Sequence, residues 1–137
     1  MLIKVQRHQG AGDFNFNMVI VDTSVWIEHF KEKNESLISL IEDDEILIHP
    51  FVIAELACGH LKNREETIGL LLKLPAPELL SIEEILIFVS KEKLYSRGVG
   101  FVDVSLLGSS ILSNALLWTY DKSLNKVSTS FDISFQE

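Results

Sequence analysis

Three aspartates stand where an apolar run of the sequence ends and a helical pattern begins. Asp22 follows the β-branched run 19–21, Asp121 follows the apolar run 116–119, and Asp103 stands at a helix start after a glycine loop. Each could simply cap the helix that follows it, because Asp is a preferred N-cap residue. In α/β proteins, however, the carboxyl ends of the strands are where chemistry usually collects. The repetition of one acid at three such junctions favours a functional cluster.

A fourth acid, Glu55, is the only charged residue in the segment 51–58, which reads FVIAELAC. A buried charge without a partner is costly, so we expect this carboxylate to be partly buried and to serve a purpose. The alternatives are that Glu55 lies on a narrow solvent-facing stripe, or that it pairs with a lysine or an arginine.

The chemistry that suits four neighbouring carboxylates is the binding of a hard cation. Without one, the carboxylates repel and raise one another's pKa. Mg²⁺ takes oxygen ligands, keeps several waters and is commonly held by one or two carboxylates plus substrate phosphate. Zinc is disfavoured because the histidines show no paired ligand spacing and the single cysteine, Cys58, has no partner. We expect Cys58 to be a small core residue, and the acidic run 42–45 to be a solvated helix end and turn.

Apolar spacing predicts the elements that position these acids. Residues 34, 63 and 81 (Asn, Asn and Ser) are candidate N-caps, the last two with glutamate at capping-box spacing. Phe131, Ile133 and Phe135 alternate with polar residues, which predicts a half-exposed final strand. The other strands are expected near 18–22, 46–48 and 116–119, and the helices near 24–31, 35–43, 51–61, 64–73, 81–89, 102–114 and 122–126. The pattern is that of an α/β fold with a short, mostly parallel central sheet flanked by helices.

Composition places the chain among single-domain globular proteins. It has 137 residues, of which 47% are hydrophobic, and its mean hydropathy is +0.22, which excludes disorder. No apolar run approaches the roughly 18 residues of a membrane-spanning helix, and no secretory signal is visible, which favours the cytoplasm. A lone cysteine excludes a disulfide framework. Residues 1–17 are polar, so we expect a leader or loosely docked extension there and one domain over 18–137.

Four segments together resemble a PIN domain, and more narrowly a ribonuclease toxin of the VapC type. The resemblance covers about 18–135, and its motifs lie at 21–27 (VDTSVWI), 53–56 (IAEL), 100–107 (GFVDVSLL) and 118–121 (WTYD). It implies a PIN-like fold in which Asp22, Glu55, Asp103 and Asp121 bind Mg²⁺ or Mn²⁺. Thr23 or Ser24, together with Thr119, would then be hydroxyls that orient those carboxylates.

The resemblance also implies a metal-dependent endoribonuclease that hydrolyses RNA phosphodiester bonds as the toxin of a type II toxin–antitoxin system. Its partners would be RNA, a cognate antitoxin that blocks the site, and a second copy in a homodimer. Ser105 stands where such relatives often have histidine, and Gly108-Ser109 replaces a more usual Ala-Ser. Neither departure touches the four acids, so both bear on substrate choice more than on activity.

The net charge of −8 opposes an RNA substrate, because nucleic acid is usually met by basic surface. Contacts to RNA must then come from local clusters that flank the acids. The candidates are Lys91, Lys93 and Arg97 before Asp103, and Lys122 and Lys126 after Asp121. The alternative is that these are scattered solubilising charges.

Two other classes of function stay open at this point. A phosphatase or phosphotransfer enzyme also places Asp at strand ends, but such enzymes usually need a second acid beside the first, and Asp22-Thr23-Ser24 offers none. A catalytically silent PIN-like binding module is the other alternative, which the acidic surface mildly favours. Detection of metal-dependent RNA cleavage would separate the ribonuclease from both.

Overall fold

The computed structural model describes residues 18–137, and its centre is a small parallel sheet in the order β2-β1-β3. β1 pairs with β2 in the register Val19 to Ile46, and with β3 in the register Val19 to Leu116. The strands are β1 (Val19–Val21), β2 (Ile46–Leu47) and β3 (Leu116–Trp118). Because all three are parallel, their carboxyl ends meet at one edge of the sheet.

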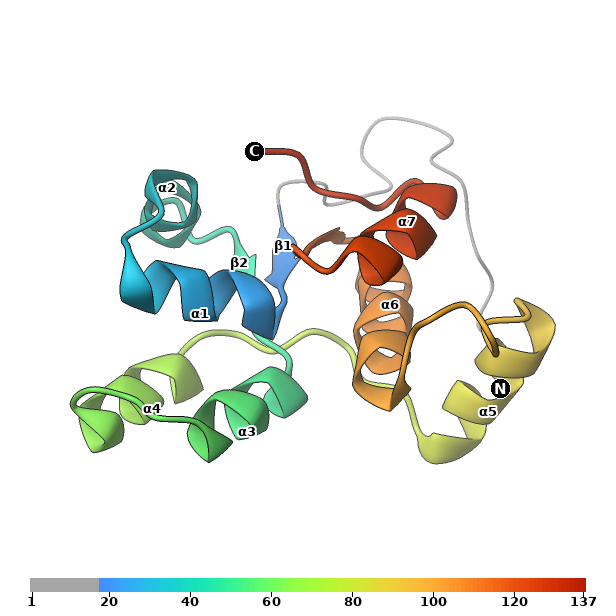
Figure 1. The fold of residues 1–137 in the computed structure, drawn as a ribbon, viewed down its shortest axis with the longest axis horizontal. Helices are drawn as coiled ribbons and strands as arrows, with labels where there is room; N and C mark the ends of the chain where they lie inside the picture. The colour runs from blue at the N-terminus through green and yellow to red at the C-terminus, as the bar shows by residue number, and fades with distance from the viewer. Residues whose placement is uncertain (1–17) are drawn as a thin grey trace.

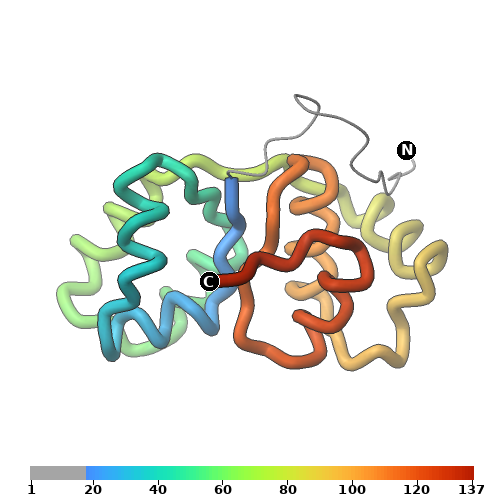
Figure 2. Tube along the Cα trace, turned by 90° about the horizontal axis from the view of Figure 1, so that it is seen from above, coloured from blue at the N-terminus to red at the C-terminus, as the bar shows by residue number. Residues whose placement is uncertain are grey.

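Helices cover the sheet in two groups. Figures 1 and 2 show β1 between one group made of α1–α4 and another made of α5–α7. The helices are α1 (Thr23–Lys31), α2 (Glu35–Glu42), α3 (Pro50–Cys58), α4 (Arg64–Leu72), α5 (Ile82–Lys91), α6 (Phe101–Ser113) and α7 (Lys122–Ser130). The expected α/β architecture with a short parallel sheet flanked by helices is therefore confirmed. None of the helices within 18–137 is long and apolar enough to cross a lipid bilayer.

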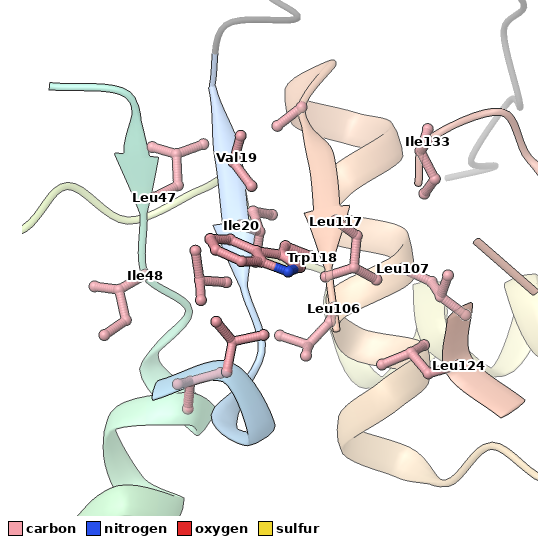
Figure 3. Packing of buried hydrophobic residues seen from close by; sticks show 14 of the residues in the cluster. Val19, Ile20, Leu47, Ile48, Leu106, Leu107, Leu117, Trp118, Leu124 and Ile133 are labelled. Atoms are coloured by element: carbon pink, nitrogen blue, oxygen red, sulfur yellow. The ribbon is translucent and has the colours of Figure 1, made fainter. Parts of the chain in front are cut away.

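The core lies where the sheet meets α6, α7 and the inner face of α1. Ile20 and Leu117 on adjacent strands are fully buried, as are Leu106 of α6 and Leu124 of α7. Figure 3 shows these side chains gathered around the strands. Since a buried Leu or Ile contributes roughly 1.5–3 kcal/mol through the removal of its surface from water, this cluster fixes the strands and the helix starts that follow them.

Two of the three expected helix caps form. The side chain of Asn34 accepts the N–H of Leu37, and Ser81 forms a reciprocal capping box with Glu84. The capping box expected at Asn63 is wrong. Asn63 lies in the left-handed region (φ 49°) and its side chain makes no cap hydrogen bond, because a left-handed backbone does not aim the side chain at the first turn.

The final strand expected over 131–135 is also wrong. α7 continues to Ser130 instead of ending near 126, because Leu124, Val127 and Phe131 continue the helical spacing of buried residues. Beyond it, Leu117 and Ser134 form an isolated parallel bridge.

α3, which was expected to reach residue 61, ends at Cys58 and is followed by Gly59. The expected leader over 1–17 lies outside the described residues and stays a prediction.

Candidate active site

Asp22 holds the most deeply placed carboxylate of the four acids. It follows β1 directly, is 7% exposed, and its N–H donates to the carbonyl oxygen of Trp118 on β3 at 2.9 Å. The hydroxyls of Ser24 and Thr119 both donate to Oδ2 of Asp22, at 2.8 and 2.7 Å. Asp22 occupies the N-cap position of α1 but makes no cap hydrogen bond. Capping therefore does not explain this acid, and within 18–137 its Oδ1 accepts no hydrogen bond.

The two hydroxyls tie Asp22 to the chain that leaves β3. Ser24 Oγ accepts the N–H of Tyr120, and Thr119 Oγ1 accepts the N–H of Asp121, both at 3.0 Å. Each hydroxyl has a single proton, and both protons are donated to Asp22. No proton is left for a hydrogen bond between Ser24 Oγ and Thr119 Oγ1, which lie 3.4 Å apart. The position of the first acid is thereby coupled to that of the last.

Glu55 is exposed, which contradicts the expected partial burial. α3 is short and buries Val52 and Leu56, so the other side of the helix, which carries Glu55, faces solvent. Its carboxylate nevertheless has a partner, because Thr23 Oγ1 donates to Oε1 at 2.6 Å. This bond joins α3 to the first residue of α1. Cys58 is exposed as well, so its expected place in the core is wrong for the same reason.

Asp103 and Asp121 lie in the first turns of α6 and α7. Asp103 Oδ2 accepts the N–H of Gly100 at 3.2 Å, and Asp121 Oδ2 accepts the N–H of Leu124 at 2.8 Å. Asp121 is therefore a true N-cap, as the simpler explanation of this residue required. Capping uses only one of its two carboxylate oxygens, so it leaves the other free for chemistry.

The electrostatics of Asp103 show that the four acids share one region. Burial raises the pKa of the Asp103 carboxyl, and the negative charges of Asp22, Asp121 and Glu55 raise it further. The N–H of Gly100 opposes this rise, because it stabilises the ionised form. One carboxyl thus senses the charge of all three others, although they come from segments far apart in the sequence.

The donor set fits a hard divalent cation in its chemistry. All four groups are carboxylates, and oxygen atoms of Asp22 and Asp121 are left without hydrogen bonds from the described residues. Among residues 18–137, however, no three histidine, cysteine, aspartate or glutamate side chains lie together closely enough to hold a metal ion. Mg²⁺ needs only one or two protein carboxylates when waters and phosphate complete its shell. The assignment of Asp22, Glu55, Asp103 and Asp121 as metal ligands stays a prediction.

An open groove of about 730 Å³ reaches Glu55 from between α1 and the α3–α4 pair. Its apolar lining includes Ile27 and Phe30, and Lys31 and Lys62 add positive charge. The sequence analysis did not identify this groove. The signal was available in part, since Ile27 and Phe30 are spaced to share one face of α1 while Val25 and Trp26 fill the core.

The sequence analysis also missed Tyr120, which lies between Thr119 and Asp121. Its hydroxyl accepts a hydrogen bond from Asn34 Nδ2 and donates one to Glu137 Oε1, both at 3.0 Å. Burial and the hydrogen bond to Glu137 raise the pKa of the Tyr120 hydroxyl. The backbone N–H of Tyr120 holds Ser24, so this residue anchors the site from outside. Its position between two selected residues was the only available clue.

Comparison with known proteins shows the family to which the chain is related. The PIN domain family matches residues 19–129. Two proteins called Ribonuclease VapC32, from Mycobacterium tuberculosis strains CDC 1551 / Oshkosh and ATCC 25618 / H37Rv, are each 40% identical to the chain over 121 residues. The aligned region is 88% of this chain and 98% of each relative.

The chain therefore belongs to the PIN domain family. Within that family it is of the VapC type, since the similarity to both VapC32 proteins extends over nearly their whole length. The family resemblance found in the sequence is confirmed.

Replacement of Asp103 by asparagine should stabilise the metal-free protein. Because the pKa of Asp103 is raised on folding, the folded state binds its proton more tightly than the unfolded chain does. The free energy of unfolding therefore falls as pH rises from about 3.8 through the folded pKa. Asparagine does not titrate and can still accept the Gly100 N–H. The Asp103→Asn variant should gain about 0.5–2 kcal/mol over the parent near neutral pH, and progressively less at lower pH.

The measurement is denaturant unfolding in EDTA from pH 3 to pH 7, with Glu78→Gln as the control, since Glu78 is an exposed acid outside the site. A difference between Asp103→Asn and parent that is the same at every pH would mean that Asp103 titrates as a solvated acid.

Proposed function

We propose that this protein is a divalent-metal-dependent endoribonuclease that hydrolyses RNA phosphodiester bonds. The observation that carries the proposal is that the charges of three other carboxylates, those of Asp22, Glu55 and Asp121, all act on Asp103. The similarity to proteins named Ribonuclease VapC32 supports RNA as the substrate. Thr23 and Ser24, the residues after Asp22, use their hydroxyls to hold acids, which gives no support to a phosphotransfer enzyme.

In this proposal Asp22 and Asp103 hold the metal, and Glu55 and Asp121 assist. The chemistry that bound Mg²⁺ or Mn²⁺ supplies is Lewis acidity toward the scissile phosphate and toward water. Ser24 and Thr119 fix Asp22 through Oδ2, so that its free Oδ1 points in one direction. Thr23 does the same for Glu55 through Oε1.

In this proposal Asp121 orients the attacking water. Its Oδ2 is held by the N–H of Leu124, while Oδ1 accepts no hydrogen bond from the described part of the chain. The residue is exposed, so water reaches it directly. An oriented carboxylate oxygen of this kind accepts a proton from water as the water attacks phosphorus in line with the leaving oxygen.

The basic residues proposed to contact RNA lie in two segments that touch each other. Gly98 has φ +78°, and a Cβ built on it would lie 2.9 Å from Ser123 Oγ. The loop before α6 therefore packs against the first turn of α7. Gly98 follows Arg97 and Ser123 follows Lys122, so this contact brings together the segments that carry the two basic residues. We propose the same RNA contacts for three other exposed lysines, Lys91, Lys93 and Lys126.

We extend the proposal to the partners of a type II toxin acting in the cytoplasm. The groove beside Glu55 offers apolar residues and lysines to an antitoxin segment, which would cover Glu55 at the same time. A second copy of the chain could cover Ile82 and Leu86, which lie one turn apart on α5 and are 60% and 62% exposed. Both assignments rest on family membership together with these exposed apolar surfaces.

Cleavage of an RNA oligonucleotide by the full chain should stop in excess EDTA and return when Mg²⁺ or Mn²⁺ is added in excess. The physical reason is that, among residues 18–137, none of these four mutually repelling carboxylates forms an ion pair with a lysine or an arginine. The measurement is product formation on a denaturing gel. Undiminished cleavage in EDTA would contradict metal dependence, and no cleavage under any metal would favour the silent binding module.

Replacement of Thr119 by valine should lower kcat by about 10- to 100-fold, the usual effect of removing a group that orients a metal ligand. Valine keeps the shape but removes the hydroxyl that donates to Asp22 and accepts from Asp121. Thr129→Val is the matched control, because that hydroxyl bonds only within α7. If both variants lose activity equally, Thr119 has no special role in the site.

Replacement of Arg97 by alanine should weaken RNA binding more than replacement of Lys73 by alanine does. Lys73 is the control, because it follows α4 directly and is far in sequence from the four acids. A lost phosphate contact should also reduce the slope of log affinity against log salt by about 0.7, the value for one charge on a single strand. Fluorescence anisotropy with a labelled RNA over a salt series measures both quantities. Equal affinities and slopes for the two variants would remove Arg97 from the RNA interface.

A further inference from the structure

Two exposed phenylalanine rings touch each other beside the acids. Phe51 of α3 is 36% exposed and Phe101 of α6 is 50% exposed. Their ring centroids are 5.4 Å apart, with 40° between the ring planes. Single exposed apolar residues are ordinary, but a contiguous exposed pair next to a functional site usually marks an interaction surface.

The ring pair bridges the same two helices as a pair of the acids. Phe51 and Glu55 are four residues apart in α3, so they share one face of the helix, about 6 Å apart along its axis. Phe101 begins α6, two residues before Asp103. The charge of Glu55 on α3 raises the pKa of Asp103 on α6, so these two helices also bring the two acids into one region. In Figure 1 the N-terminal ends of α3 and α6 lie beside each other below β1.

Phe51 is held firmly in this position. His49 is 3% exposed, its Nδ1 accepts the N–H of Phe51 at 3.0 Å, and the two rings lie 4.8 Å apart. Pro50 between them fixes its own φ in the helical range. Burial lowers the pKa of His49 to about 4, so the imidazole stays neutral and keeps this acceptor at physiological pH. These contacts hold the backbone of Phe51 at the start of α3 and one side of its ring, while the ring stays partly exposed.

We propose that Phe51 and Phe101 form a stacking platform for one unpaired RNA base next to the phosphate bound at the acids. The inference rests on the proposed ribonuclease function and deepens it. Bases stack on aromatic side chains whatever their identity, provided they are not already paired in a duplex. In a chain of net charge −8, surrounding carboxylates repel phosphate, and stacking supplies affinity that no charge opposes.

The variant that tests the platform is Phe101→Leu, which keeps an apolar side chain of similar size and removes the ring. With Mg²⁺ present, its kcat/KM on a single-stranded RNA should fall about tenfold, mainly through KM, as expected for one lost base–aromatic contact. Phe101→Trp keeps a ring and should match or exceed the parent. Tyr95→Leu is the control, because Tyr95 is also an exposed aromatic residue (59%) but lies outside the ring pair.

A second substrate separates stacking from a structural role. The same RNA is made with a single abasic nucleotide at each position around the cleaved bond in turn. At one position the parent should lose about as much as Phe101→Leu does, and the two proteins should then cleave that RNA equally. The platform is wrong if Phe101→Leu cleaves the native RNA like the parent, or if its loss persists undiminished on every abasic RNA.

Other occupants of the rings would be revealed by the same variants. If Phe101→Leu converts a dimer to a monomer in light scattering while RNA cleavage is unchanged, the rings cover a second copy and the platform is wrong. If the parent itself neither binds nor cleaves RNA, the proposed function fails and the platform with it. Cleavage by the parent without any dependence on the two rings would overturn the platform alone.

Discussion

The structure depends on how one buried carboxylate is satisfied. Asp22 is 7% exposed, and a buried charge is tolerated only when hydrogen bonds replace its water. Its donors are Ser24, two residues later in the sequence, and Thr119, 97 residues later. Thr119 is available only because β1 and β3 are parallel neighbours, so that both strands end at the same edge. Strand order and site geometry are therefore a single constraint, since any other pairing of β1 would leave Asp22 buried without its second donor.

The same edge must also accommodate the mutual repulsion of four carboxylates. Three of them lie at helix starts: Asp22 before α1, Asp103 in the first turn of α6, and Asp121 before α7. Helix N-termini carry a partial positive charge that favours an anion by about 0.3–1 kcal/mol each. This offsets part of the repulsion in the folded chain itself. The remainder falls on Asp103, whose carboxyl pKa is raised by burial and by its neighbours. A divalent cation would remove that remaining cost, which links the stability of this edge to the proposed cofactor.

Local sequence signals predicted most elements of the fold, and they failed where burial depends on distant packing. Asn34 and Ser81 cap helices as expected, because a cap is decided within four residues. The exposure of Glu55 and Cys58 was not predictable from the apolar segment 51–58, since it depends on how little of α3 the rest of the chain covers. The three aspartates were selected by their junctions and Glu55 by its apolar surroundings, and the family resemblance pointed to the same four acids, whose role as a site stays a prediction. The resemblance also named the hydroxyls of Thr23 or Ser24 and of Thr119, but which acid each one holds required the tertiary arrangement. The contact of Phe51 with Phe101 required it as well.

An acidic protein that handles RNA needs affinity that is concentrated near the cleaved bond. In the proposed function, the packing of Gly98 against Ser123 would do this for the basic residues, because it joins the loop that carries Arg97 to the start of the helix that carries Lys122. With about 8 Å of screening length at physiological salt, a few cations beside the acids matter more to a nearby phosphate than the net charge of the whole surface. Stacking on Phe51 and Phe101 would act at the same short range and without charge. Both features arise at helix starts around the carboxyl edge of the sheet, so in this proposal the arrangement that satisfies Asp22 would also determine where RNA is held.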